Sequence, residues 1–145
     1  MAGQTGITFQ DAPSMILRNA SDKDLVAICV QECPRKVKSK RASELEVHMN
    51  AMGYHAISAE LLDMWEMFLL VFIKRELVAE TANVSAMKLA KGAMKGMIGN
   101  KGAIAYNFTL KNRHFNVIAT HLRHGQNAVA ERDQMASELV SELRL

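Results

Sequence analysis

The middle of the chain carries the apolar run Phe68-Leu69-Leu70-Val71-Phe72-Ile73-Lys74. The longest apolar run of the sequence, Met67 to Ile73, is far below the roughly 20 residues that a membrane-spanning helix needs. Short apolar segments that are bounded by polar joints are typical of β-strands. We therefore expect a strand here.

Further short segments of apolar or alternating character predict more strands on both sides of this run. They are Leu25–Val30, Tyr54–Ser58, Val84–Leu89, Ile104–Leu110 and Phe115–Thr120. The first is continuously apolar and rich in β-branched residues, which favours a strand buried on both faces. The last two flank Lys111–His114, a turn of hairpin length.

Two helices are expected. The first follows Ser43–Glu46, which has the form of a capping box, and should end at Gly53. The basic stretch Arg35–Arg41 before it indicates a solvated loop that leads into the helix. The second helix covers Ala128–Leu145 with Asn127 as its N-cap. The apolar residues expected near one face of this second helix are Val129, Ala136, Leu139, Val140 and Leu143.

This order of elements predicts an α+β fold, a layered α/β sandwich with a largely antiparallel or mixed sheet and flanking helices. The 145 residues suit a single domain. Because the amphipathic helix at Leu145 needs a sheet beneath it, we expect this domain to be incomplete.

The composition is that of a globular protein, with 49% hydrophobic and 23% charged residues. A net charge of +3 is too small for a nucleic-acid coat or a polybasic membrane arm. Cys29 and Cys33 are the only cysteines, which favours a reducing compartment over a disulfide scaffold. The N-terminal residues lack the features of a signal peptide, so a cytoplasmic location is expected.

Glu32 is the first candidate for chemistry. It lies just after the predicted strand Leu25–Val30, at a sheet edge where α/β folds place their ligands. Magnesium is commonly held by one or two carboxylates together with waters and phosphate oxygens, so one Glu can anchor it. The alternative is an exposed Glu at a strand end.

The second candidate is the glycine-rich run Lys91–Gly102. Its glycines allow a ligand to approach the backbone, and Lys91, Lys95 and Lys101 add charge suited to phosphate. The run matches neither a P-loop nor the dinucleotide fingerprint. The alternative is a flexible loop between two strands, with Asn100 and the glycines setting a turn.

The third candidate is His121, at the end of the last predicted strand, with Arg123 and Arg132 as charged helpers. A histidine can donate a proton or a hydrogen bond to a phosphoryl oxygen at neutral pH. The alternative is an ordinary polar residue. Three elements suited to phosphate in one small chain are stronger evidence for a phosphate site than any one of them alone.

The order of four motifs resembles the inositol polyphosphate 5-phosphatases, which belong to the endonuclease/exonuclease/phosphatase superfamily. The motifs are Val30-Gln31-Glu32-Cys33, Phe68–Lys74, Ile98-Gly99-Asn100-Lys101-Gly102-Ala103 and Thr120-His121-Leu122. The similarity runs from about Leu25 to Arg132. It implies a two-sheet sandwich flanked by helices.

The resemblance also implies a Mg²⁺-dependent hydrolase that removes the 5-phosphate from phosphoinositides or soluble inositol polyphosphates. Glu32 matches the family's metal-binding glutamate, and His121 matches the histidine that contacts the scissile phosphate. Asn100 and Lys101 match the motif that shapes the substrate side of the site, and Arg123 is a further phosphate-binding candidate. Peripheral membrane contact is an additional expectation.

The chain departs from the family pattern in two places. Aligning Ala12-Pro13 puts Ile7 and Thr8 where the family has a Trp-Asn pair. The family's later Gly-Asp-x-Asn and Ser-Asp-His motifs are not found between Arg132 and Leu145. We therefore expect this chain alone not to turn over substrate at a normal rate.

Two other functions stay open. A non-catalytic module that binds phosphoinositides or a protein partner would explain Thr8 in place of Asn. A nuclease of the same superfamily finds little support in 6% aromatic residues and a modest charge, so no nucleic acid is expected. The stretch Met64–Phe68 could form a lipid-facing edge, but its more economical role is filling the core.

Overall fold

The computed structural model describes residues 12–20, 22–93 and 98–143. Strand β4 (Met67–Lys74) lies at the centre and pairs antiparallel with three other strands. They are β1 (Leu25–Val30), β2 (Tyr54–Ala56) and β3 (Leu62–Met64). A second antiparallel sheet, in the order β5-β6-β7, contains β5 (Thr81–Ala93), β6 (Ile98–Leu110) and β7 (Arg113–His121). The 3₁₀ helix η1 (Arg75–Glu80) connects β4 to β5.

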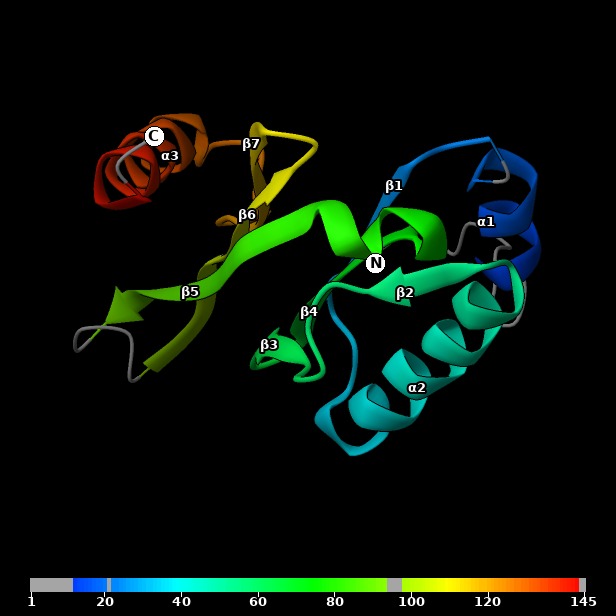
Figure 1. Cartoon of the computed structure of the whole chain (residues 1–145). Helices are drawn as coiled ribbons and strands as arrows, with labels where there is room; N and C mark the ends of the chain where they lie inside the picture. Colours follow the sequence, from blue (N-terminus) through cyan, green and yellow to red (C-terminus); the bar gives the residue numbers. More distant parts are fainter. Residues whose placement is uncertain (1–11, 21, 94–97, 144–145) are drawn as a thin grey trace.

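The two sheets pack face to face and helices cover their outer sides (Figure 1). Between the sheets, Leu69 and Val71 of β4 pack in one core with Ile104 and Phe108 of β6. On the other face of β4, Phe68, Leu70 and Phe72 pack against α2 (Arg35–Ala51), with α1 (Ala12–Ala20) beside it. Helix α3 (Val129–Leu143) lies against the second sheet. This α+β architecture confirms the predicted fold class.

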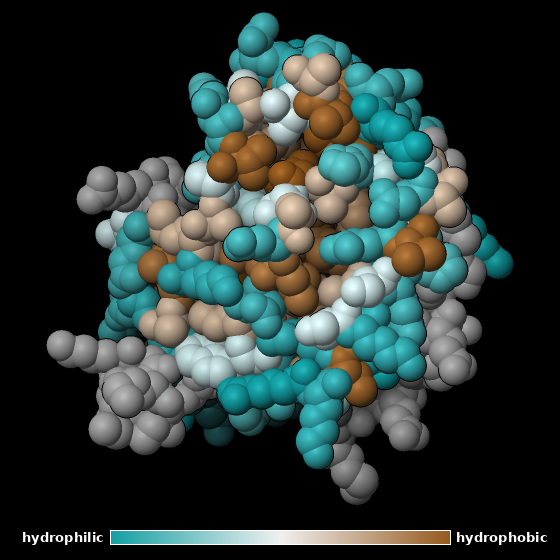
Figure 2. All heavy atoms as spheres, turned by 60° about the horizontal axis from the view of Figure 1, so that its bottom comes forward, coloured by the Kyte–Doolittle hydropathy of each residue, from teal (hydrophilic) through white to brown (hydrophobic). Residues whose placement is uncertain are grey.

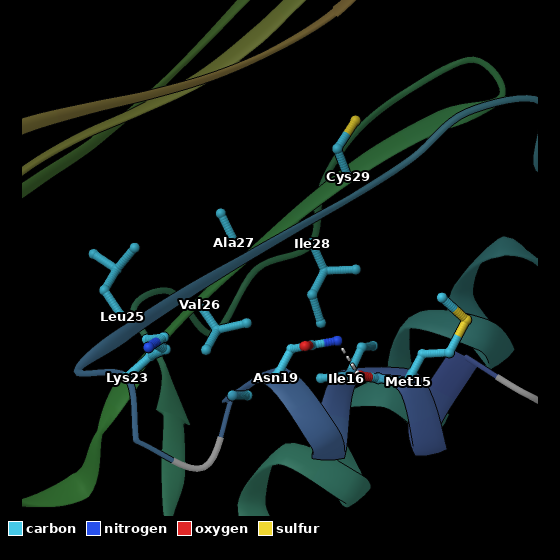
Figure 3. Close-up of a pocket in the computed structure, with 10 residues that line it drawn as sticks. Met15, Ile16, Asn19, Lys23, Leu25, Val26, Ala27, Ile28 and Cys29 are labelled. Atoms are coloured by element: carbon cyan, nitrogen blue, oxygen red, sulfur yellow. Dashed lines mark hydrogen bonds between the residues drawn. The ribbon is translucent and has the colours of Figure 1, made fainter.

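The prediction that β1 is buried on both faces is wrong. Its side chains alternate: Val26 and Ile28 point toward α1, whereas Ala27 and Cys29 point the other way and are exposed (Figure 3). In the described part of the chain β1 pairs only with β4, so it lies at an edge of the sheet. A hollow of about 500 Å³ lies between α1 and β1.

Helix α2 begins at Arg35, so the basic stretch Arg35–Arg41 is helical and not a loop. The predicted capping box at Ser43 is therefore wrong, because Ser43 lies in mid-helix. The helix places Lys38, Ala42, Leu45 and Met49 on one buried face, while the remaining basic residues contact solvent. The predicted end is confirmed: Gly53 has φ +85°, a conformation that glycine adopts without a steric penalty.

Helix α3 ends at Leu143 within the described residues, and its apolar face is narrower than predicted. Leu139 is buried, but Val129 and Val140 are exposed. The sequence pattern also missed three short elements, namely α1, β3 and η1.

Strands β5 and β6 are much longer than predicted. Residues 98–102, expected in a loop, form the first part of β6, because Lys91 and Ala90 of β5 pair with Lys101 and Gly102. The turn after β6 is only Lys111-Asn112, with φ of +49° and +60°. Such paired positive angles match the two-residue hairpin turn that fits the twist of the strands.

Among residues 12–20, 22–93 and 98–143, no helix is long and apolar enough to cross a bilayer. Met67 and Phe68 are fully buried, so they fill the core and do not form a lipid-facing edge. On the face shown in Figure 2, apolar patches are divided by hydrophilic side chains.

Gly102 gives a direct test of the close contact between β5 and β6. It has φ +154°, and a Cβ there would lie 2.1 Å from the Leu89 carbonyl oxygen and 2.8 Å from the Met64 methyl group. Because a backbone atom blocks the space, the strands themselves would have to move. We expect Gly102→Ala to lower the free energy of unfolding by about 1–3 kcal/mol more than Gly53→Ala does.

The control isolates the steric term, since Gly53 also has positive φ but open space around it. Gly53→Ala should cost only the conformational penalty, about 1–2 kcal/mol. Urea denaturation of both variants makes the comparison, and equal losses would disprove the close contact.

Candidate active site

Glu32 lies directly after β1 in a left-handed backbone conformation, with φ +55°. Such a conformation is uncommon for a residue with a side chain and is found more often at functional sites. The next residue secures it, because the Cys33 amide donates a 2.8 Å hydrogen bond to the Glu66 carbonyl in the turn between β3 and β4. The carboxylate of Glu32 itself points into solvent, with 74% of its side chain exposed.

His121 lies at the end of β7 and its side chain is only 8% exposed. Its partner across the ladder is Gly102, which has no side chain to crowd the imidazole. Lys101, the residue before Gly102, places its Nζ 2.9 Å from His121 Nε2. A lysine from β6 and a histidine from β7 are thus joined by a hydrogen bond.

The end of β1 meets the end of β7. Gln31 Nε2 donates a 2.6 Å hydrogen bond to the Thr120 carbonyl, which joins the two sheets at this point. The residues that follow Gln31 and Thr120 are also close, because Glu32 Oε1 lies 4.0 Å from His121 Nε2. Three residues predicted from separate motifs, Glu32, Lys101 and His121, therefore lie together. Their chemical roles remain predictions.

The other predicted site residues lie elsewhere or are only partly described. Arg123 forms a 2.7 Å ion pair with Glu131 of α3, and Arg132 donates to the Gly125 carbonyl. Lys91 is paired with Glu138 at 3.1 Å and with Glu142, and these hydrogen bonds raise its pKa. The side chains of Arg123 and Lys91 are therefore paired with carboxylates of α3.

Part of the glycine-rich motif falls outside the described residues. Asn100 belongs to β6 by its backbone, but its side chain is not described. Lys95, Ile7 and Thr8 also lie outside the described residues.

An ion pair that the sequence pattern did not predict, between a buried lysine and a half-buried aspartate, supports the Glu32 segment. Lys38 of α2 is 7% exposed, contacts the Asp63 carboxylate and donates a 2.6 Å hydrogen bond to the Trp65 carbonyl. Trp65 and Glu66 form the turn to which Cys33 is bonded. The spacing of Lys38 from Ala42 and Leu45, at i+4 and i+7, could have placed it on the buried face of a helix.

The surroundings of Glu32 offer few ligands for a metal ion such as Mg²⁺. Among the described residues no group of three or more His, Cys, Asp or Glu side chains is close enough to hold a metal ion. Mg²⁺ keeps several waters and takes phosphate oxygens from the substrate, so one exposed carboxylate fits as a single anchor. Glu32 is the residue that would hold such an ion.

The sequence comparison places the chain in a family. Residues 5–145 match the model of endonuclease/exonuclease/phosphatase family 2, and the chain belongs to this family. No curated protein matches the sequence significantly.

Solved structures share the fold. The inositol polyphosphate 5-phosphatase domain of SPsynaptojanin, in complex with inositol (1,4)-bisphosphate and calcium, superposes with a TM-score of 0.75 at 21% identity. The match covers 92% of this chain and 41% of that one. TDP2 of D. rerio with a single-strand DNA product gives 0.61 at 12% identity, covering 99% and 51%. A Cimex nitrophorin in a ferrous NO complex gives 0.61 at 16% identity, covering 84% and 44%.

These comparisons establish a phosphoesterase-type fold of the endonuclease/exonuclease/phosphatase superfamily. The ligands of the three structures differ widely, so the fold does not decide the substrate. The chain spans about two fifths of the synaptojanin domain.

The Lys38–Asp63 ion pair predicts a pH dependence of stability. Burial alone would raise the pKa of Asp63, but the hydrogen bonds and charges of Lys38 and Lys88 outweigh burial and lower it below 3.8. A carboxyl whose pKa is lower in the folded state stabilises the fold fully above its unfolded pKa and loses this contribution as the pH falls through the folded pKa. The stability difference between the wild type and Asp63→Asn should therefore shrink below about pH 4.

Urea denaturation of both proteins between about pH 7 and about pH 3 measures this difference. Asp133→Asn, at an exposed position of α3, is the matched control and should follow the wild type at each pH. If the Asp63→Asn difference stays constant across the range, the ion pair does not support the fold.

Proposed function

We propose that this chain supplies the phosphate-binding part of a Mg²⁺-dependent phosphomonoesterase. Its substrate class is inositol polyphosphates or phosphoinositide headgroups, from which the 5-phosphate is removed. The observation that carries the proposal is the meeting of Glu32, Lys101 and His121, with distances of 4.0 Å and 2.9 Å between their polar atoms.

Each residue has a role that suits its chemistry. The carboxylate of Glu32 anchors the cation, and Lys101 holds a phosphate oxygen with its ammonium group. A lysine has three N–H donors, so the bond to His121 leaves donors for phosphate. His121, nearly buried at the end of β7, contacts the scissile phosphate. When bound, Mg²⁺ supplies charge neutralisation at a phosphoryl oxygen during attack by water.

Several observations favour an inositol phosphate over other phosphate esters. The motifs that carry these residues resemble those of the inositol polyphosphate 5-phosphatases, and the structure at TM-score 0.75 contains inositol (1,4)-bisphosphate. Nucleic acid is a weaker candidate, because the net charge of +3 gives little attraction for a polyanion. The match with TDP2 rests on 12% identity and on the fold alone.

A binding module without catalysis is the second candidate. It is favoured by the small ligand set, since in the described part of the chain no three His, Cys, Asp or Glu side chains lie close enough together to hold a metal ion. The two candidates differ in one measurable property, because only the enzyme releases inorganic phosphate.

Glu32→Gln tests the proposed anchor. The variant keeps the size of the side chain but removes its charge, so we expect Mg²⁺ affinity to fall at least tenfold, about the loss seen when metal-site residues are changed. Mg²⁺ is titrated calorimetrically in the presence of an inositol polyphosphate, and phosphate release is recorded from the same samples. For the wild-type chain we expect binding with only slow release.

Glu76→Gln is the control. Glu76 is an exposed residue of η1, which follows the end of β4 opposite to the Glu32 end. Unchanged Mg²⁺ affinity in Glu32→Gln would refute the anchor. Binding of the inositol polyphosphate without any release, lost in Glu32→Gln, would favour the binding module.

A further inference from the structure

The hydrogen bond between Lys101 and His121 determines where the imidazole carries its proton. The two atoms, Nζ and Nε2, are 2.9 Å apart. A lysine ammonium can only donate, so His121 Nε2 must accept. An imidazole that accepts at Nε2 is neutral and holds its proton on Nδ1. The geometry thus selects one of the two neutral tautomers.

This tautomer matters for Glu32. The Glu32 Oε1 atom lies 4.0 Å from the same Nε2 atom, close enough for a small movement to form a hydrogen bond. A protonated Nε2 could donate to this oxygen and would then compete with a cation for it. An Nε2 atom that already accepts from Lys101 cannot do so.

We propose that Lys101 is a positioning residue that holds His121 in the Nδ1–H form and so keeps the Glu32 carboxylate available to a cation. The benefit to cation binding rests on the proposed function, whereas the tautomer does not. Lys101 thereby has a role besides phosphate binding, and it acts on Glu32 through the ring of His121.

The side-chain contacts of two neighbouring lysines make this role specific to Lys101. Gly102 pairs with His121 and has no side chain to fill the space beside the imidazole, and Lys101, the residue before it, places its Nζ 2.9 Å from Nε2. Lys91 pairs with Lys101 across β5 and β6, yet its ammonium contacts Glu138 and Glu142 of α3. These two neighbouring lysines therefore form a matched pair for an experiment.

The test measures the ring nitrogens of His121 directly. The full chain is labelled with ¹⁵N, and long-range ¹H–¹⁵N spectra are recorded at about pH 8, where an ordinary imidazole is neutral. The ring signals of His121 are assigned as those that are missing from the spectrum of His121→Gln. We expect a bare Nε2 and a protonated Nδ1 in the wild type, and a shift of the population toward Nε2–H in Lys101→Met.

Two further variants complete the design. Lys101→Arg retains a donor and should restore the wild-type pattern, and Lys91→Met should leave the His121 signals unchanged. A wild-type His121 with a proton on Nε2, whether alone or together with Nδ1, would overturn the proposal. So would an unchanged pattern in a Lys101→Met variant whose amide spectrum shows it folded. If that variant does not fold, the wild-type spectrum decides.

The measurement uses neither substrate nor metal. An Nδ1–H His121 in a chain that fails to bind Mg²⁺ would leave the positioning role intact while refuting the proposed function. A His121 protonated on Nε2, in a chain that binds Mg²⁺ through Glu32, would refute the positioning role and leave the proposed function intact.

Discussion

The structure depends on the burial of both faces of β4. From Met67 to Ile73 each side chain of this strand is buried. An apolar strand of this kind cannot lie at a surface, so one face must be covered by helix α2 and the other by the second sheet. The layered sandwich follows from this requirement, and the remaining elements take their places around β4.

The same strand sets the position of the candidate site. Val30, the last residue of β1, pairs with Phe68 near the start of β4. The chain therefore leaves β1 beside the turn between β3 and β4, where Glu66 binds the Cys33 amide and fixes the backbone of Glu32. Across the sandwich, Gln31 contacts Thr120 and brings the end of β7 to the same place. Core packing and two polar contacts thus bring distant motifs together.

Hydrophobic patterning predicted most strands and the fold class, because the apolar residues of β4, β6 and β7 leave few alternatives. Hydrophobic patterning gave the wrong structure where one stretch of sequence fits both a loop and a helix. The basic residues after Pro34 resemble a loop by charge, but they belong to α2, in which Lys38 is buried against Asp63 while Arg35, Lys36 and Lys40 are exposed. A contact between residues 25 positions apart cannot be read from local sequence.

The candidate site was predictable in its members but not in its contacts. Glu32, Lys101 and His121 were each suggested by a local motif, and the strand ends were correct for Glu32 and His121. The partners of Arg123 and Lys91 were not predictable, since both depend on how α3 packs on the second sheet. Likewise, the hydrogen bond from Lys101 to His121 was not predictable, because a loop over Lys91–Gly102 does not place Gly102 opposite His121 as the β6–β7 ladder does.

The central claim is that a cation held by Glu32 lies beside His121, and Mn²⁺ tests it most directly. Mn²⁺ binds the same oxygen ligands as Mg²⁺ and broadens the NMR signals of nearby protons. His114, at the other end of β7, lies seven residues from His121, about 23 Å at the usual rise of a strand. The account predicts that Mn²⁺ broadens the ring signals of His121 while those of His114 stay sharp. Sharp His121 signals, or equal broadening at both histidines, would contradict it.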